Sequence, residues 1–100
     1  MNELNQLEQA VYELIPRGIE NCRKFKDLNA HIDKRSFYYI INSLRRKGKV
    51  IGAIRGKQGG YFVATTEEER VIATRQFEAQ VKDEMAIVSA MKKAELEDIA

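Results

Sequence analysis

The stretch Arg45–Glu69, RRKGKVIGAIRGKQGGYFVATTEEE, changes chemical character three times in 25 residues. It opens with basic residues around a glycine. It continues with apolar, β-branched residues on both sides of a glycine-rich centre, and it closes on two threonines and three glutamates. This order predicts the end of a basic helix, a glycine-tipped β-hairpin and the start of an acidic helix in direct succession.

The predicted hairpin has two short strands, Val50–Ile54 and Tyr61–Ala64, joined by the loop Arg55–Gly60. Three glycines in the loop allow the chain to turn. Its two cations, Arg55 and Lys57, are expected beside the preceding helix. Both strands mix apolar and small residues, so the pattern leaves open which side chains face inward.

Upstream of the hairpin, the sequence predicts a helix that begins after an Asp33 N-cap and runs to about Lys47, where Gly48 closes it. Residues at helical spacing are expected to face the core: Phe37, Ile40, Ile41 and Leu44. The opposite face and its flank are basic, aromatic and amide-bearing. The face carries Arg35, Tyr39, Asn42 and Arg46, and the flank carries Lys34, Tyr38 and Arg45.

The N-terminal part predicts a first helix that ends at Pro16 and Gly18. Its expected core-facing stripe is Leu4, Leu7, Val11 and Leu14. Its polar residues are expected to face solvent: Glu3, Gln6, Glu8 and Glu13. A short second helix is predicted from about Lys24 to Ala30, followed by a tight turn at His31–Asp33.

A capping box, Thr66–Glu69, predicts a final helix from Glu67 to about Lys93. One apolar stripe follows it through Val71, Thr74, Phe77, Val81, Met85 and Val88, and the stripe is widened by Ile72, Ile87, Met91, Leu96 and Ile99. At ~1.5 Å per residue this helix is about 40 Å long, which exceeds the ~26 Å diameter of a compact domain of this size.

The far half of that stripe therefore predicts a homodimer, because it extends past the body of its own domain. The expected dimerisation residues are Phe77, Val81, Met85, Val88 and Met91. The spacing leaves the direction of the two helices open. The competing outcome is a helix that breaks near Lys82–Glu84 and folds back as a monomer.

Charge is distributed unevenly, although the net charge is only +2. Residues 1–60 carry 12 basic and 6 acidic side chains, a balance of +6, whereas residues 61–100 carry 5 and 9, a balance of −4. From Lys34 to Lys57 there are eight basic residues and no acidic one. A local positive field of this kind favours a polyanionic partner.

Composition argues against several classes of protein. A chain of 100 residues suits one domain, and no apolar run approaches the ~20 residues of a membrane span. The acidic N-terminus is unlike a signal peptide, and the single cysteine, Cys22, suits a reducing cytoplasm. There is no metal-ligand spacing, no phosphate-binding loop between a strand and a helix, and no serine beside a base. We therefore expect neither an enzyme nor a cofactor.

The stretch Lys26–Glu69 resembles a winged helix-turn-helix domain. In particular, it resembles small phage and prophage proteins of Gram-positive bacteria whose wing ends in a GGYF-A-T-EEE pattern, here Gly59–Glu69. The resemblance implies a recognition helix at Asp33–Lys47 and a wing at Lys49–Thr65. The expected fold class is α+β, mostly α.

In that fold, three helices and the β-hairpin wing occupy residues 1–66, and the long C-terminal helix occupies residues 67–100. The outward face of the recognition helix suits double-stranded DNA, because arginine donates to guanine edges and asparagine pairs with adenine. The wing cations are expected on phosphates or in the minor groove. The predicted DNA-binding residues are Lys34, Arg35, Tyr38, Tyr39, Asn42, Arg45, Arg46, Arg55 and Lys57.

Two functions remain open at this point. The first is a sequence-specific DNA-binding protein of the cytoplasm, such as a phage or prophage transcriptional regulator or a replication-associated factor. The second is a protein-interaction module on the same scaffold, such as a replisome, helicase-loader or host-takeover protein. The pair Tyr38-Tyr39 departs from common forms of the fold, where small polar or basic residues are frequent. It is compatible with both functions, because the two rings can stack on sugars or contact a thymine methyl, and can equally form part of a protein-binding surface.

Overall fold

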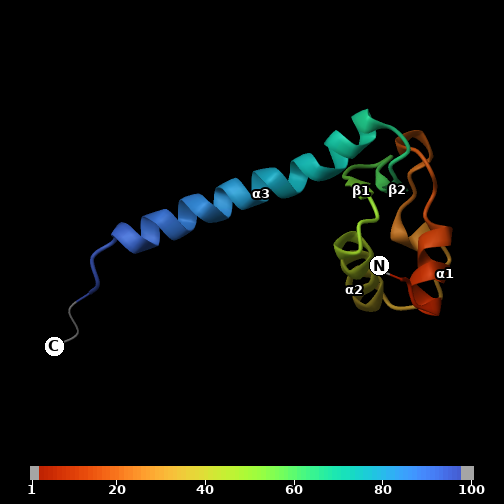
Figure 1. Ribbon diagram of the computed structural model, residues 1–100, viewed down its shortest axis with the longest axis horizontal. Helices are drawn as coiled ribbons and strands as arrows, with labels where there is room; N and C mark the ends of the chain where they lie inside the picture. The colour runs from red at the N-terminus through yellow and green to blue at the C-terminus, as the bar shows by residue number, and fades with distance from the viewer. Residues whose placement is uncertain (1–2, 98–100) are drawn as a thin grey trace.

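The computed structural model describes residues 3–97. In that range Figure 1 shows a small body from which one long helix projects. The elements are α1 (Gln6–Leu14), two single 3₁₀ turns (Ile19–Asn21 and Phe25–Asp27), α2 (Lys34–Arg46), β1 (Ile51–Ile54), β2 (Gly60–Val63) and α3 (Glu67–Lys93). The predicted class, α+β with mostly helix, is confirmed.

The core lies between α1, α2 and the hairpin. It is built from Val11, Ile15, Leu28, Phe37, Ile40, Ile41, Leu44, Ile51 and Val63. All four α2 residues predicted to face inward are buried. The ring of Phe37 lies 4.8 Å from the ring of Phe25 and 5.1 Å from that of Tyr61, measured between centroids. This contact fixes α2 against both the preceding turn and the hairpin.

Both predicted ends of α2 are confirmed. The side chain of Asp33 accepts a hydrogen bond from the backbone N–H of Ser36 at 3.2 Å, as an N-cap does. At the other end Gly48 has φ +91°, and the N–H of Lys49 donates to the carbonyl of Leu44 at 3.0 Å. Glycine suits this left-handed conformation, so the ends of α2 are set by local chemistry.

The hairpin pairs β1 and β2 in antiparallel register, with Ile51 opposite Val63 and Gly52 opposite Phe62. The sequence left open which side chains of the two strands face inward, and the structure shows them. Ile51 and Val63 join the core, and Phe62 is fully buried. A Cβ at Gly52 would lie 2.3 Å from the tip of the Phe62 ring, so the ring needs the space that glycine leaves.

A third segment pairs with the outer edge of β2 and leaves β1 as the edge strand. Arg23 donates its N–H to the carbonyl of Tyr61 at 3.1 Å and accepts the Tyr61 N–H at 2.7 Å. The chains approach closely here, since a Cβ at Gly60 would lie 2.1 Å from the Arg23 carbonyl carbon. Gly60 also has φ +154°, which L side chains rarely adopt.

The predicted helix Lys24–Ala30 is wrong. Only the single 3₁₀ turn Phe25–Asp27 forms there. Asn29 and His31 both have left-handed backbone conformations, with φ 53° and 55°. Such residues interrupt the repeating hydrogen bonds of a helix, so the chain turns twice before α2 instead of completing a helix.

The predicted inner face of α1 is also wrong in part. Leu7 is 52% exposed and Leu14 is 40% exposed, whereas Glu8 is buried together with Val11 and Ile15. Glu8 also closes a capping box with Asn5: the Asn5 side chain accepts the Glu8 N–H at 2.7 Å, and the Glu8 carboxylate accepts the Asn5 N–H at 2.9 Å.

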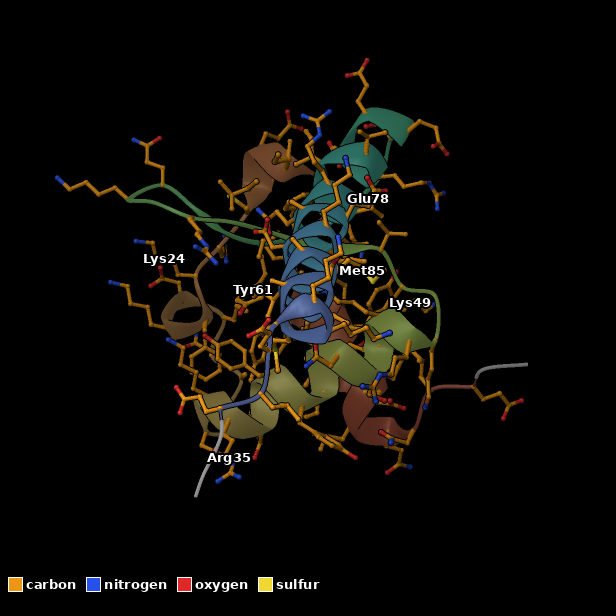
Figure 2. All side chains as sticks on the ribbon, turned by 90° about the vertical axis from the view of Figure 1, so that its left-hand side faces the viewer. Lys24, Arg35, Lys49, Tyr61, Glu78 and Met85 are labelled. Carbon is orange, nitrogen blue, oxygen red and sulfur yellow. The ribbon has the colours of Figure 1, made fainter. Side chains whose placement is uncertain are left out.

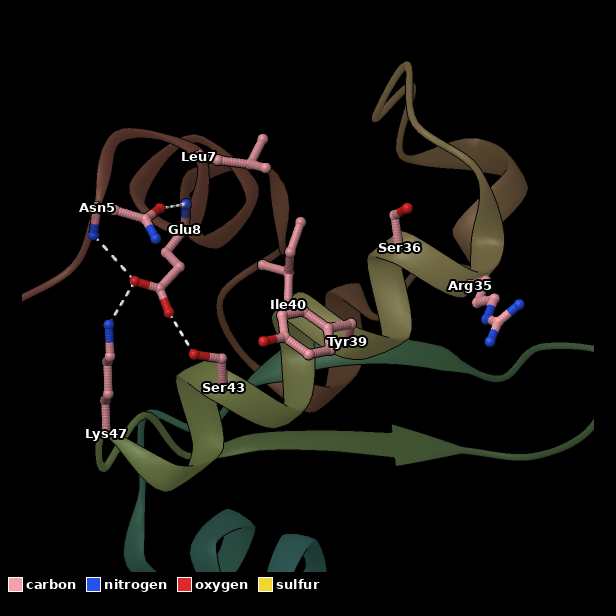
Figure 3. Close-up of a pocket in the computed structure, with 9 residues that line it drawn as sticks. All are labelled: Asn5, Leu7, Glu8, Arg35, Ser36, Tyr39, Ile40, Ser43 and Lys47. Atoms are coloured by element: carbon pink, nitrogen blue, oxygen red, sulfur yellow. Dashed lines mark hydrogen bonds and ion pairs between the residues drawn. The ribbon is translucent and has the colours of Figure 1, made fainter.

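The Glu8 carboxylate joins α1 to α2. It forms an ion pair with the Lys47 ammonium group at 2.6 Å and accepts a hydrogen bond from the Ser43 hydroxyl (Figure 3). The bond from Lys47, then that from Ser43, then that from Asn5, hold the pKa of Glu8 at about 2. Both carboxylate oxygens of Glu8 thus meet donors, which explains how this charged group can be buried here.

Acid should weaken this α1–α2 contact through Glu8. Its folded-state pKa, about 2, lies below the ordinary value of 4.5. Its contribution to stability is therefore complete above the ordinary pKa and is lost as the pH falls from 4.5 through 2. The Glu8→Gln variant should lose less urea-midpoint stability than the native chain across this window. Glu13→Gln, an exposed acid on the same helix, should keep the native profile; identical profiles for all three would show that Glu8 is not responsible.

The long helix α3 is continuous from Glu67 to Lys93, so the predicted alternative with a break near Lys82–Glu84 is not the structure. The Thr66 side chain accepts the Glu69 N–H at 3.1 Å, as predicted. The Glu69 carboxylate does not accept the N–H of Thr66, as a capping box requires. It accepts the N–H of the preceding residue, Thr65, at 2.9 Å.

The projecting helix makes the molecule elongated. The radius of gyration is 17.5 Å and the longest dimension 57 Å, whereas a compact chain of this length has a radius of about 13 Å. Among the described residues of α3, only Ala73 is buried. Of the predicted stripe, Leu96 is exposed and Ile99 lies outside the described residues. None of the helices within residues 3–97 has the length and apolar character needed to cross a bilayer.

Candidate nucleic-acid interface

The outer edge of β1 is covered by side chains from α2 and α3. The Arg45 Nε donates to the Ile51 carbonyl at 2.9 Å, and the Gln76 Nε2 donates to the Ala53 carbonyl at 2.9 Å. The Arg45 guanidinium also lies 5.0 Å from the ring centroid of Phe77. An exposed edge strand presents unpaired carbonyls, and these two donors satisfy them.

Arg45 therefore takes a different role from the one its position on the helical wheel predicts. Its side chain is partly buried, and burial lowers the pKa of its guanidinium, although arginine stays charged at neutral pH. Because the guanidinium lies between the edge of β1 and Phe77 on α3, we omit Arg45 from the residues offered to a partner.

A groove of about 1250 Å³ lies between the turn Phe25–Asp27, α2, the hairpin and the middle turns of α3. Arg45 lines this groove too. We call it the basic groove and define it by the other four cations on its lining: Lys24, Lys26, Lys34 and Arg55. The one acid on its lining is Asp83 of α3. Figure 2, in which α3 points toward the viewer, shows Lys24 and Tyr61 on one side of α3 and Lys49 on the other.

The cations of the basic groove are not neutralised by neighbouring acids. Within residues 3–97 the ion pairs are Lys47 with Glu8 and Arg70 with Glu67, and neither involves the groove. Four unpaired positive charges on one concave surface produce a positive potential, which attracts anions.

Two of these cations are not among the DNA-binding residues predicted from the sequence. Lys24 and Lys26 lie outside the run of basic residues in α2 and the hairpin. They reach the groove because the turn that contains them is held against β2 by the pairing of Arg23 with Tyr61. The available signal is their alternation with Phe25, which packs against the core and so directs its two neighbours outward.

Aromatic side chains also line the groove. Tyr38 is 44% exposed, and the Lys34 ammonium group lies 5.7 Å from its ring centroid. Burial, and then the neighbouring Tyr38 hydroxyl, raise the pKa of Tyr61 to about 12. The Tyr61 phenol therefore stays protonated well above neutral pH.

The other α2 residues that were predicted to bind DNA are exposed, and they line hollows next to the basic groove. Arg35 and Tyr39 line a hollow of about 510 Å³ beside α1, where Leu7 also lies (Figure 3). Arg46 lines a hollow near the start of α3, and Asn42 borders both that hollow and the basic groove. The outward face of α2 is thus a ridge between hollows.

The hairpin loop places its two cations differently. Arg55 lines the basic groove, whereas Lys57 lies further along the loop and does not line it. Both side chains are exposed. The structure therefore joins Lys34, Tyr38, Asn42 and Arg55 in one groove and leaves Lys57 at the tip, where it can reach only a partner larger than the groove.

Among residues 3–97 no group of three or more His, Cys, Asp or Glu side chains could hold a metal ion. No family model matches the chain, and no significant match occurs among curated proteins or solved structures.

Proposed function

We propose that this chain is a winged helix-turn-helix protein that binds double-stranded DNA. In this proposal α2 enters the major groove and the hairpin is the wing, which contacts the flanking backbone or minor groove. The order of elements supports it: α1, a short turn, α2, and a hairpin whose β2 pairs with a third segment at Arg23. The turn Phe25–Asp27 takes the place of the first helix of the motif.

The observation that carries the proposal is the convergence of cations on the basic groove. Lys24 and Lys26 come from the turn, Lys34 from the start of α2, and Arg55 from the hairpin. Segments distant in sequence are thus brought beside one helix with their charges unpaired. Phosphate contacts from such side chains position a protein on DNA and account for most of its salt-dependent affinity.

In this proposal, the ridge of α2 recognises the DNA sequence. Arg35, Asn42 and Arg46 are exposed on the face opposite the core. Arginine pairs with guanine and asparagine with adenine through two hydrogen bonds each in the major groove. The proposed role is that of a phage or prophage transcriptional regulator or replication-associated factor in the cytoplasm.

The direct test is a fluorescence-anisotropy titration of the full chain on a random-sequence duplex at several salt concentrations. Four phosphate contacts predict that log K falls with log salt with a slope of about −3.6. Affinity should therefore drop by roughly a hundredfold between ~50 and ~200 mM salt. Absence of duplex binding at low salt would refute the proposal.

Substituting Asn42 or Arg46 with alanine should reduce sequence discrimination. On a duplex selected from a random pool for tight binding, each change should cost about 1–3 kcal/mol, and on random duplexes much less. Gln9→Ala, which removes an exposed amide from α1, is the matched control and should leave both affinities unchanged. Equal losses on selected and random duplexes would show that Asn42 and Arg46 contact only the backbone.

A protein-interaction role has one specific observation in its favour. Tyr39 is 77% exposed and Leu7 is 52% exposed, and both line the hollow between α1 and α2. Two large, accessible side chains at a concave site suit a protein partner. Under this alternative, Tyr39→Ala would abolish partner binding in a pull-down, whereas duplex binding would be absent in the native chain.

A further inference from the structure

The free part of α3 carries an uncovered apolar stripe. We define the α3 stripe as Phe77, Val81, Met85, Val88 and Met91, the residues predicted to mediate dimerisation. Their side chains are between 44% and 71% exposed. The stripe lies on a helix that leaves the body, so no part of the described chain covers its far end (Figure 1). Exposed apolar surface of this extent indicates a partner.

Three residues of the stripe, together with Glu84, follow a spacing that suits a second helix. From Val81 the positions Glu84, Val88 and Met91 follow at steps of three, four and three residues, the repeat of a two-stranded coiled coil. Met85 lies beside this seam on one side and Ile87 on the other.

We propose that a second copy of this chain covers the α3 stripe, and that the two α3 helices run antiparallel. This inference goes beyond the proposed DNA binding and does not depend on it. Two features support a second copy and the antiparallel direction: the charged residues in and beside the seam, and the length of α3 that projects from the body.

A parallel pair would be unfavourable because of Glu84. In a parallel, in-register pair each seam residue meets its own copy, so the carboxylate of Glu84 would face the partner's Glu84 in an apolar seam. The residues flanking a parallel seam would supply no compensating opposite charges: Gln80 would meet the partner's Met85, and Ile87 would meet the partner's Lys92.

An antiparallel pair centred on Ala86 removes this conflict. Val81 then meets the partner's Met91, and Glu84 meets the partner's Val88. The aliphatic stem of Glu84 can cover that valine while its carboxylate accepts the Gln80 side-chain N–H, which lies 3.2 Å away. Beside the seam, Met85 and Ile87 each lie near their own copies.

The same register pairs opposite charges at both ends. Glu78 lies beside the partner's Lys92, and by symmetry Lys92 lies beside the partner's Glu78. The overlap also matches the free length of α3. The helix packs on the body up to Phe77 and ends at Lys93, so each helix would end where the body of its partner begins.

Cysteine cross-linking tests the direction. In a Cys22→Ser background, the matched variants are Met85→Cys and Lys92→Cys, which occupy equivalent positions beside the seam. In the antiparallel pair the two copies of position 85 lie almost level, whereas the two copies of position 92 are about 18 Å apart along the axis. A short bismaleimide should therefore link Met85→Cys rapidly and Lys92→Cys hardly at all. A mixture of Glu78→Cys and Lys92→Cys chains should form the mixed product.

Equal cross-linking of Met85→Cys and Lys92→Cys, without the mixed product, would overturn the antiparallel direction. Sedimentation equilibrium tests the pairing itself. We expect twice 11.5 kDa at tens of micromolar for the native chain, and 11.5 kDa for the Val81→Asp, Val88→Asp variant. A native mass of 11.5 kDa would overturn the dimer.

Charge reversal supplies a milder perturbation that leaves the apolar seam intact. Glu78→Lys and Lys92→Glu should each raise the dissociation constant of the dimer by roughly tenfold, and the double variant should restore it. Failure of the double variant to recover would refute the Glu78–Lys92 pairing. None of these measurements involves DNA, so their outcome is independent of the proposed DNA binding.

Discussion

Replacing Phe37 with alanine should lower the free energy of unfolding by about 3–5 kcal/mol, the largest effect of any single change we predict. The side chain is fully buried and contacts the rings of Phe25 and Tyr61. The cavity left behind would lie where α2, the turn and the hairpin meet. Urea unfolding followed by circular dichroism measures this effect.

Tyr39→Ala is the matched control, since it removes an aromatic ring from the exposed face of the same helix. Its effect on stability should stay within about 0.5 kcal/mol. If Phe37→Ala were equally mild, α2 could not be packed through Phe37, and the placement of both the ridge and the basic groove would be wrong.

Neutralising the basic groove should have the largest effect on DNA binding. The variant carrying Lys24→Gln, Lys26→Gln, Lys34→Gln and Arg55→Gln loses all four defining cations. At physiological salt its affinity for a random duplex should fall roughly a thousandfold, and its salt slope should shrink by about 3.6. Side chains at the surface can be exchanged in this way without loss of the core, which thermal unfolding would verify.

A second variant distinguishes the effect of the basic groove on duplex affinity from the effect of net charge. Arg75→Gln, Lys82→Gln and Lys93→Gln remove three exposed cations from α3 and leave the proposed Glu78–Lys92 pair intact. Its duplex affinity should change far less, because these residues lie along the projecting helix. Equal losses in the two variants would mean that DNA responds to total charge and that the basic groove is not its site.

The proposed DNA binding and the proposed antiparallel dimer together predict a distance between the two bodies of the dimer. In the antiparallel register the Ala73 residues, where α3 packs on each body, lie ~39 Å apart along the helix axis. Two half-sites on one side of B-DNA are ~34–36 Å apart, a similar separation. The two bodies of such a dimer would therefore lie about one turn of DNA apart where they meet α3.

Local chemistry in the sequence determines the ends and the inner face of α2. Asp33 caps the first turn, and Gly48 adopts the left-handed conformation that ends the helix. Phe37 and Leu44 follow the 3.6-residue period toward the core. These interactions join residues within one or two turns of each other, so no knowledge of the rest of the chain is needed to predict them. The continuous helix α3 was predictable for the same reason.

Only the tertiary structure decides where flanking side chains go. Glu8 turns inward because Lys47, 39 residues later, supplies the opposite charge. Arg45 packs on β1 and Phe77 because the edge strand needs donors, and Lys24 reaches the basic groove because its turn is held against the hairpin. Periodicity assigns a residue to a side of its own helix, but the partner on that side comes from a distant segment. The sequence by itself therefore determines the elements and the core of α2, and the folded chain decides which charges remain for a partner.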